Sequence, residues 1–85
     1  MLFRATIKIM LKQSVNDPQG NAVLTGLNSL GFKSVENVRV GKFIAIDLQA
    51  SNEQSAESQV TEMCEKLLAN TVIESFDFVL DEITI

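Results

Sequence analysis

The strictest constraint on this chain of 85 residues is the spacing of its apolar side chains. The spacing switches repeatedly between every second residue, as in a strand, and about every 3.6 residues, as in a helix. Residues 3–11 alternate apolar with polar side chains, so that Phe3 and every second residue after it share one face. Successive side chains of a strand point to opposite sides of a sheet. The segment therefore predicts a strand with one buried face.

A first helix is predicted between Asp17 and Leu30. Asp17 is a good N-cap residue, and Pro18 follows at the first helical position, where its missing N–H costs nothing. Gly31 can take the left-handed conformation that commonly ends a helix. The apolar stripe of this helix consists of Val23, Leu27 and Leu30.

Residues 35–49 are rich in β-branched side chains and predict a second strand. Gly41 interrupts this run. A tight hairpin at Val40-Gly41 would force valine to positive φ, which its branched Cβ resists. We therefore predict one long central strand with a bulge or bend at Gly41.

A second helix is predicted from Ser51 or Asn52 to about Asn70, and a third strand follows it. The apolar stripe of this helix consists of Ala56, Val60, Met63, Cys64 and Leu67. The last strand contains Phe76, Phe78 and Leu80, with a short tail to Ile85.

This order predicts a single α+β domain over residues 1–85. Two amphipathic helices can cover only one face of an antiparallel sheet, which gives a two-layer sandwich with the order β-α-β-α-β. The other face carries apolar side chains among polar neighbours such as Arg4 and Thr6, and packing against a second copy would bury them. We therefore predict a homodimer or tetramer. The apolar side chains of that face are Met10, Phe43, Ala45 and Val79.

Charge is distributed unevenly along the chain. The net charge is -4, with six bases and three acids through Ser51, and one base and eight acids from Asn52 onward. Such a chain suits docking against protein, whereas a nucleic-acid binder normally has a basic excess and stacking aromatics, and Trp and Tyr are absent. No apolar run approaches the roughly 18 residues of a membrane helix, and one cysteine cannot form an internal disulfide. Both observations favour a cytoplasmic protein.

The sequence lacks the residues of common catalytic sites. It contains no histidine, which is the commonest general base and metal ligand. Cys64 lies in the apolar stripe of the second helix, where a buried structural thiol is expected rather than a nucleophile. We expect no catalytic residue, no metal site and no cofactor on this chain.

Two charged regions allow both a plain and a functional interpretation. Carboxylates in the second half are either ordinary solvated charges on the outside of a helix or an acidic docking surface. Arg39 and Lys42 flank Gly41 and could bind a phosphate or an acidic partner, or simply border a strand bulge. No glycine-rich phosphate loop is present, because neither GxGxxG nor GxxxxGK occurs. The carboxylates are Glu53, Glu57, Glu62, Glu65, Asp77, Asp81 and Glu82.

Four motifs occur together in the order and spacing of one known family. They are Asp17-Pro18-Gln19-Gly20, Leu30-Gly31-Phe32, Val38-Arg39-Val40-Gly41-Lys42 and Asn70-Thr71-Val72-Ile73-Glu74. Through them the chain resembles PurS, the small-subunit family of phosphoribosylformylglycinamidine (FGAM) synthase in purine biosynthesis, over nearly its whole length. Thr71 departs from the family, which usually has proline there, and this concerns the rigidity of that turn.

The resemblance implies a non-catalytic subunit of an ATP-dependent carbon–nitrogen ligase that uses glutamine as amide donor. It also implies two partners, the glutaminase subunit PurQ and the synthetase subunit PurL, which a dimeric small subunit bridges. ATP and magnesium would belong to the assembled complex. A subunit that aligns two active sites can support ammonia transfer, because ammonia released to water is protonated and no longer a nucleophile.

The matching motifs give the predicted partner interface. Replacing Arg39 and Lys42 by alanine is expected to leave the fold intact and to weaken assembly of the complex. The interface residues are Asp17, Pro18, Gln19, Gly20, Arg39, Gly41 and Lys42.

Two other functions are compatible with the residues. A compact α+β domain can be a dimeric regulatory module that binds a small molecule, and a metabolite would then stabilise it against heat. A free-standing enzyme using Cys64 or the carboxylates fits the residue inventory less well.

Overall fold

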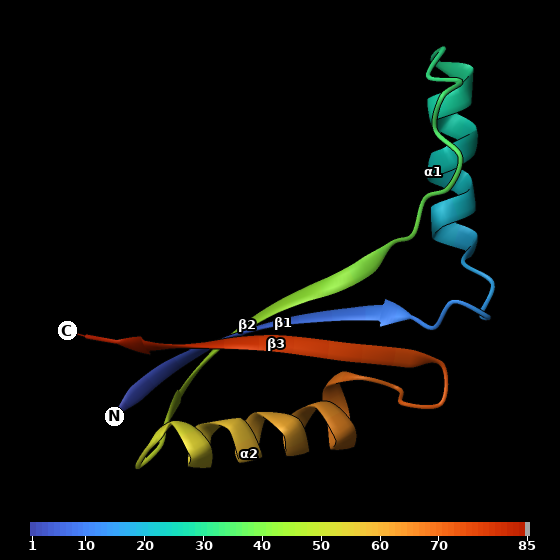
Figure 1. The fold of residues 1–85 in the computed structure, drawn as a ribbon. Helices are drawn as coiled ribbons and strands as arrows, with labels where there is room; N and C mark the ends of the chain where they lie inside the picture. Colours follow the sequence, from blue (N-terminus) through green and yellow to red (C-terminus); the bar gives the residue numbers. More distant parts are fainter. Residues whose placement is uncertain (85) are drawn as a thin grey trace.

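The computed structural model describes residues 1–84 as one sheet with two helices (Figure 1). The predicted α+β class, with an antiparallel sheet and the order β-α-β-α-β, is confirmed. Ile85, the end of the predicted tail, lies outside the described residues. The elements are β1 (Leu2–Leu11), α1 (Pro18–Ser29), β2 (Gly41–Gln49), α2 (Glu53–Met63), its π-helical continuation η1 (Cys64–Leu68), and β3 (Glu74–Ile83).

β1 is the central strand of the sheet, whose order is β2-β1-β3, so the prediction that the strand around Gly41 is central is wrong. It pairs antiparallel with both neighbours, and its Ile7 lies opposite Ile44 on β2 and Phe78 on β3. The predicted alternation is confirmed, because the odd-numbered residues from Phe3 to Ile9 are buried. The most regular alternation in the sequence thus belongs to the strand that has neighbours on both sides.

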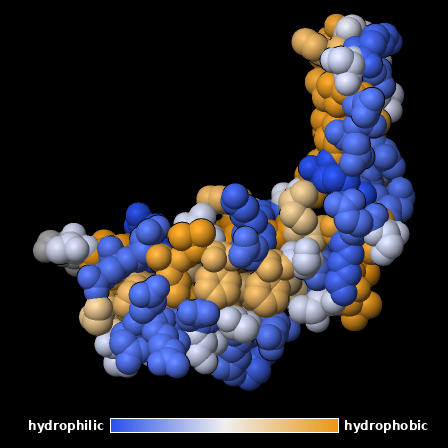
Figure 2. Space-filling model, in the orientation of Figure 1, coloured by the Kyte–Doolittle hydropathy of each residue, from blue (hydrophilic) through white to orange (hydrophobic). Residues whose placement is uncertain are grey.

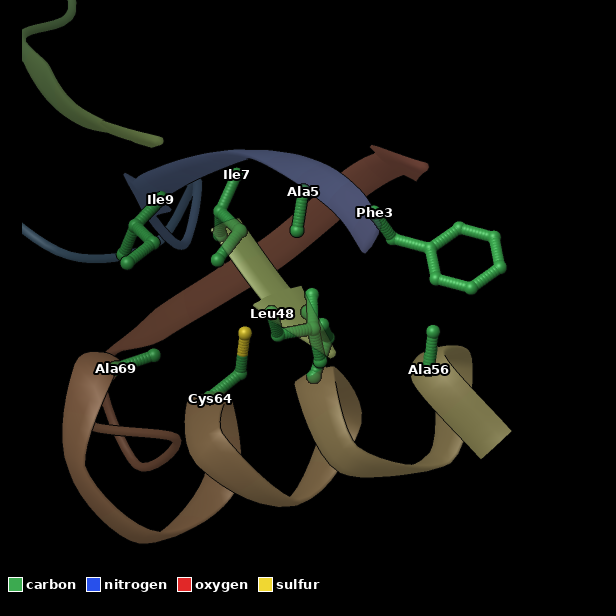
Figure 3. Close-up of a cluster of buried hydrophobic side chains, with 9 residues drawn as sticks. Phe3, Ala5, Ile7, Ile9, Leu48, Ala56, Cys64 and Ala69 are labelled. Carbon is green, nitrogen blue, oxygen red and sulfur yellow. The ribbon is translucent and has the colours of Figure 1, made fainter. Parts of the chain in front are cut away.

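α2 covers one face of the sheet beneath β1 and β3 (Figure 1). Asn52 caps it as predicted, since its side-chain oxygen accepts a hydrogen bond from Ser55 N at 2.8 Å. Ala56 and Cys64 point from the helix toward the strands (Figure 3). The buried apolar core consists of Phe3, Ala5, Ile7, Ile9, Leu48, Ala56, Val60, Cys64 and Ala69.

The end of this helix differs from the prediction. In η1, Ala69 N donates to Cys64 O at 2.9 Å. This bond spans five residues rather than four, so the apolar stripe moves forward by one position. Leu67, predicted to lie in the stripe, is 83% exposed, whereas Leu68 packs against the core. The helix ends at Leu68, before the predicted Asn70.

α1 does not pack on the sheet, so the prediction of two helices on one face is wrong. α1 stands away from one end of the sheet, and the chain runs back beside it to β2, so that sheet and helix form an L (Figure 1). We call residues 18–40 the arm. The radius of gyration is 16.6 Å, against about 12 Å for a compact chain of this length. Amphipathicity shows that α1 needs an apolar cover, but it does not show which chain supplies that cover.

β2 begins at Gly41, so the predicted long strand with a bend at this residue is not formed. Gly41 pairs with Met10, and β1 ends one residue later at Leu11. Residues 35–40 therefore have no neighbouring strand with which to form a ladder, and they become the return segment of the arm. Gly31 has φ 96° after α1, which confirms the predicted left-handed end of that helix.

The second face of the sheet is bare. Its apolar residues Phe43 and Val79 are 66% and 60% exposed. At one end of this face, Arg4 donates to both carboxylate oxygens of Asp47, at 2.8 and 3.0 Å. The charged end is thus paired within the chain, whereas the apolar part has no cover among the described residues. We call this surface the open face.

Candidate partner-binding site

Asp17 joins the two ends of the arm. Its Oδ1 accepts a hydrogen bond from Gly20 N at 2.9 Å, and its Oδ2 accepts one from Val40 N at 2.8 Å. The residue is 3% exposed. These backbone donors, first Gly20 and then Val40, hold the pKa of Asp17 below its ordinary value, with a smaller contribution from the charge of Arg39. One carboxylate therefore caps α1 and fixes the return segment where it reaches β2.

Gly20 permits this close approach because it has no side chain. A Cβ at this position would lie 2.2 Å from Val38 O and 2.8 Å from Asp17 Oδ2. Val38 O is a main-chain atom, so it cannot move aside unless the return segment moves. The last residue of the Asp17–Gly20 motif thus sets the packing of α1 against that segment.

Arg39 stabilises the same junction from the return segment. Its Nη2 donates to Lys12 O at 2.9 Å and to Val15 O at 3.1 Å, with a longer contact to Leu11 O at 3.5 Å. The carbonyls of Lys12 and Val15 belong to the connection between β1 and α1, and Leu11 is the last residue of β1. Alanine at this position would remove these hydrogen bonds, so we now expect it to loosen the junction.

Gly41 and Lys42 begin β2 directly beside this junction. A Cβ on Gly41 would lie 2.2 Å from Met10 Sδ and 2.4 Å from Ile9 O. The pairing of β2 with β1 at this position therefore requires glycine. Lys42 Nζ lies 3.4 Å from Leu68 O and 3.6 Å from Glu74 Oε2. A cavity of about 220 Å³ lies here, below the roughly 300–1,000 Å³ usual for small-molecule sites. Its lining is Ile9, Leu11, Gln19, Val40, Gly41, Lys42 and Glu74.

The structure brings the predicted interface residues together at the base of the arm. Asp17 and Gly20 are buried, and Arg39 is half-buried, whereas Pro18, Gln19, Gly41 and Lys42 are exposed. Accessible side chains are thus presented by Pro18 and Gln19 on the helix and by Lys42 at the start of β2. The partners of the buried ones are main-chain atoms, such as Val40 N, which residue identities alone do not reveal.

The arm also carries exposed apolar side chains, including two that were predicted to pack on the sheet. Val23 is 45% exposed and Leu30 is 75% exposed, and Phe32 beyond the helix is 56% exposed. Figure 2 shows apolar surface along the side of the arm that faces the inside of the L. A helix of twelve residues with this little internal packing gains stability when another surface covers it.

The described residues contain few groups suited to catalysis. Cys64 is fully buried, and this burial, with a smaller effect of the Glu65 charge, raises the pKa of its thiol. No cluster of three or more potential ligands among residues 1–84 is placed to hold a metal ion. In the same residues, no helix has the length and apolar character needed to cross a bilayer.

Comparison with known proteins identifies a family that matches almost the whole sequence. Residues 4–82 match the family described as PurS, phosphoribosylformylglycinamidine (FGAM) synthase. The PurS subunit of the Synechocystis enzyme is 46% identical over 89% of this chain and 76% of its own length. The Bacillus subtilis subunit is 40% identical over 96% of both chains.

Solved structures of PurS share the fold. Thermus thermophilus PurS has a TM-score of 0.86 and 41% identity, covering 99% of this chain and 100% of that one. A chain in the structure of PurLQS from Thermotoga maritima has a TM-score of 0.87 and 30% identity, covering 94% of this chain and 98% of that one. With the family match over almost the whole sequence, these similarities show that this chain belongs to the PurS family of FGAM synthase subunits.

Proposed function

We propose that this chain is the non-catalytic small subunit of an FGAM synthase complex, where it bridges a glutaminase subunit, PurQ, and a synthetase subunit, PurL. The observation that carries the proposal is the arm, a helix held rigidly at its base and left without a cover along its length. Exposed apolar surface of this kind marks a site of contact with another protein chain. The similarity to a chain of the Thermotoga maritima PurLQS structure supports the same assignment.

The open face supports a homodimer or tetramer within this assembly. Its exposed Val79 lies opposite Thr6 of β1, which has Ala45 on its other side, and its exposed Phe43 lies opposite Lys8. A second copy placed on this surface would remove apolar area from water at roughly 25 cal/mol per Å². It would leave the Arg4–Asp47 pair at the edge of the contact, where an exposed ion pair costs little desolvation.

ATP and magnesium would be bound by the synthetase subunit and not by this chain, and the assembled enzyme would work in the cytoplasm. The described residues offer no fit to either group, because they contain neither a phosphate loop nor a ligand cluster. This chain contributes to ammonia transfer by holding the active sites of the glutaminase and the synthetase in a fixed relative position. Pro18, Gln19 and Lys42 are the residues of the predicted interface with accessible side chains, and Asp17, Gly20, Arg39 and Gly41 hold the base of the arm behind them.

Reconstitution from three purified subunits tests this function. Glutamine-dependent FGAM formation should require this chain, and the three subunits should co-elute, with the effects of glutamine and nucleotide measured separately. A glutamine-dependent rate that is the same with and without this chain would overturn the proposal.

An ammonium salt in place of glutamine tests the transfer role. If the chain serves to deliver ammonia, ammonium should restore product formation by the synthetase when this chain is omitted. A requirement for the chain that persists undiminished with ammonium would instead place its effect on the synthetase itself.

A further inference from the structure

β3 is an edge strand with one side open to a further strand. The sheet order places β1 on its only paired side, and no other strand within residues 1–84 covers the opposite side. β3 is ten residues long. The outward N–H and C=O groups of such an edge can pair with an added strand.

A groove of about 350 Å³ accompanies this edge, between β3 and the first half of α2. Its apolar lining repeats every second residue of β3, which is also the spacing of side chains on one face of an added strand. Its remaining lining residues are acidic. The apolar residues are Phe76, Phe78 and Leu80, and the acidic ones are Glu53, Glu57 and Asp77.

The carboxylates of this groove lack ion-pair partners within the described residues. Glu62, on the same helix but outside the groove, pairs with Lys66. Neither Glu53 nor Glu57 forms an ion pair within residues 1–84. Uncompensated negative charge therefore collects along the groove.

Asp77 and Glu74 complete the charges on this edge. Asp77 lies opposite Lys8 of β1 but forms no ion pair with it in the described structure. Glu74, at the start of β3, lies 3.6 Å from Lys42. The acidic character is thus strongest where the groove is, away from the junction at the base of the arm.

The charge of the β3 edge argues against a second copy of this chain as its occupant. β3 contains four acids and no base, so pairing with another β3 would bring carboxylates together. β2, the other edge, contains one lysine and one aspartate and shows no such bias. A strand that carries bases therefore has charge complementarity with the β3 edge but not with the β2 edge.

We propose that the β3 edge and its groove bind an extended, lysine- or arginine-bearing segment of a partner subunit as a fourth strand. The main chain of that segment pairs with β3. Its apolar side chains lie on Phe76, Phe78 and Leu80, and its bases reach Glu53 and Glu57. This inference rests on the proposed function, because it names the surface through which one of the two large subunits is held.

The test uses the reconstituted complex and two variants of equal net charge, one in α2 and one spanning the end of α2 and η1. Glu53→Gln with Glu57→Gln removes the rim of the groove, and Glu62→Gln with Glu65→Gln removes two charges of the same helix outside it. The groove variant should bind the partner subunits about fivefold to tenfold more weakly, with a smaller dependence on salt, since each exposed pair contributes modestly. The control variant should bind like the unmodified chain.

Amide hydrogen exchange locates the contact directly. Amides of residues 74–83 that exchange rapidly in the free chain should become protected in the complex. Equal affinity of both variants with unprotected β3 amides would overturn the inference and leave the proposed function intact. Protection of the edge by self-association of the free chain would also overturn it, and failure of the unmodified chain to bind would overturn both proposals.

Discussion

Alanine at Gly20 and at Gly26 should have opposite effects on the same helix. Both glycines lie in α1, but a Cβ on Gly20 would lie 2.2 Å from Val38 O, whereas a Cβ on Gly26 would meet no atom within 4 Å. The first variant must displace the return segment and, with it, the hydrogen bonds of Asp17 to both ends of the arm. The second variant only removes the conformational freedom of a helical glycine.

The magnitudes follow from these contacts. Overpacking against main chain costs about 1–3 kcal/mol, and the gain in helix propensity from glycine to alanine offsets about 0.5–1 kcal/mol. The net loss for Gly20→Ala is roughly 1–2 kcal/mol, which corresponds to about 5- to 30-fold faster exchange of the arm amides. Gly26→Ala should slow the same exchange by about two- to fivefold.

Hydrogen exchange resolved by residue is the right assay, because α1 does not pack on the sheet. The arm should open without the rest of the molecule, so amides of β1 and α2 should keep their exchange rates in Gly20→Ala. Equal exchange of the arm in the two variants would refute the reasoning. Loss of protection throughout β1 in Gly20→Ala would refute the independence of the arm.

Three further changes test other parts of the structure. Because folding lowers the pKa of Asp17, its stabilisation of the junction should be complete about one pH unit above the unfolded pKa of roughly 3.9 and lost as the pH falls through the folded pKa. An NMR titration of its carboxyl carbon with a midpoint at or above about 3.9 would contradict this. Buried Cys64 should react with iodoacetamide at least about 100-fold more slowly in the native chain than in denaturant, and fast native alkylation would show that the thiol is accessible. Phe43→Lys on the open face should weaken self-association at least about tenfold in sedimentation, whereas Leu67→Lys, exposed elsewhere, should not; equal effects would remove the open face from the contact.

The elements that the sequence predicted correctly are those whose apolar residues are covered within the chain. β1 follows its alternation because β2, β3 and α2 all contact it. The caps at Asp17 and Asn52 were predictable because each acts on a backbone N–H three residues ahead. Local chemistry was sufficient in these cases.

The features that the sequence did not predict depend on which neighbour is available. The β-branched run before Gly41 was expected to be strand, yet β1 ends one residue beyond the partner of Gly41. The stripe of α1 was expected to cover the sheet, yet the hydrogen bonds of Asp17 direct the helix away from it. Neither the length of a partner strand nor a main-chain donor such as Val40 N can be read from residue types.

The resemblance to PurS located the interface motifs without giving their roles. Arg39 was expected to face a partner, but its guanidinium donates to the carbonyls of the β1–α1 connection. Such a contact leaves no periodic signal, because its acceptors are main-chain atoms. A motif shared with a family thus identified the region, and only the geometry separated the exposed Pro18 and Gln19 from the buried residues behind them.

The rigid base of the arm has a direct consequence for binding. A free helix of this length in water would be mostly unfolded, and ordering it at the moment of association would weaken the complex. Asp17 and Arg39 fix both ends of the arm before any partner arrives, so the binding-competent fraction stays high. The apparent dissociation constant rises as that fraction falls. Residues that touch no partner can therefore control the affinity of the subunit, which explains how a buried aspartate and a glycine belong to an interaction motif.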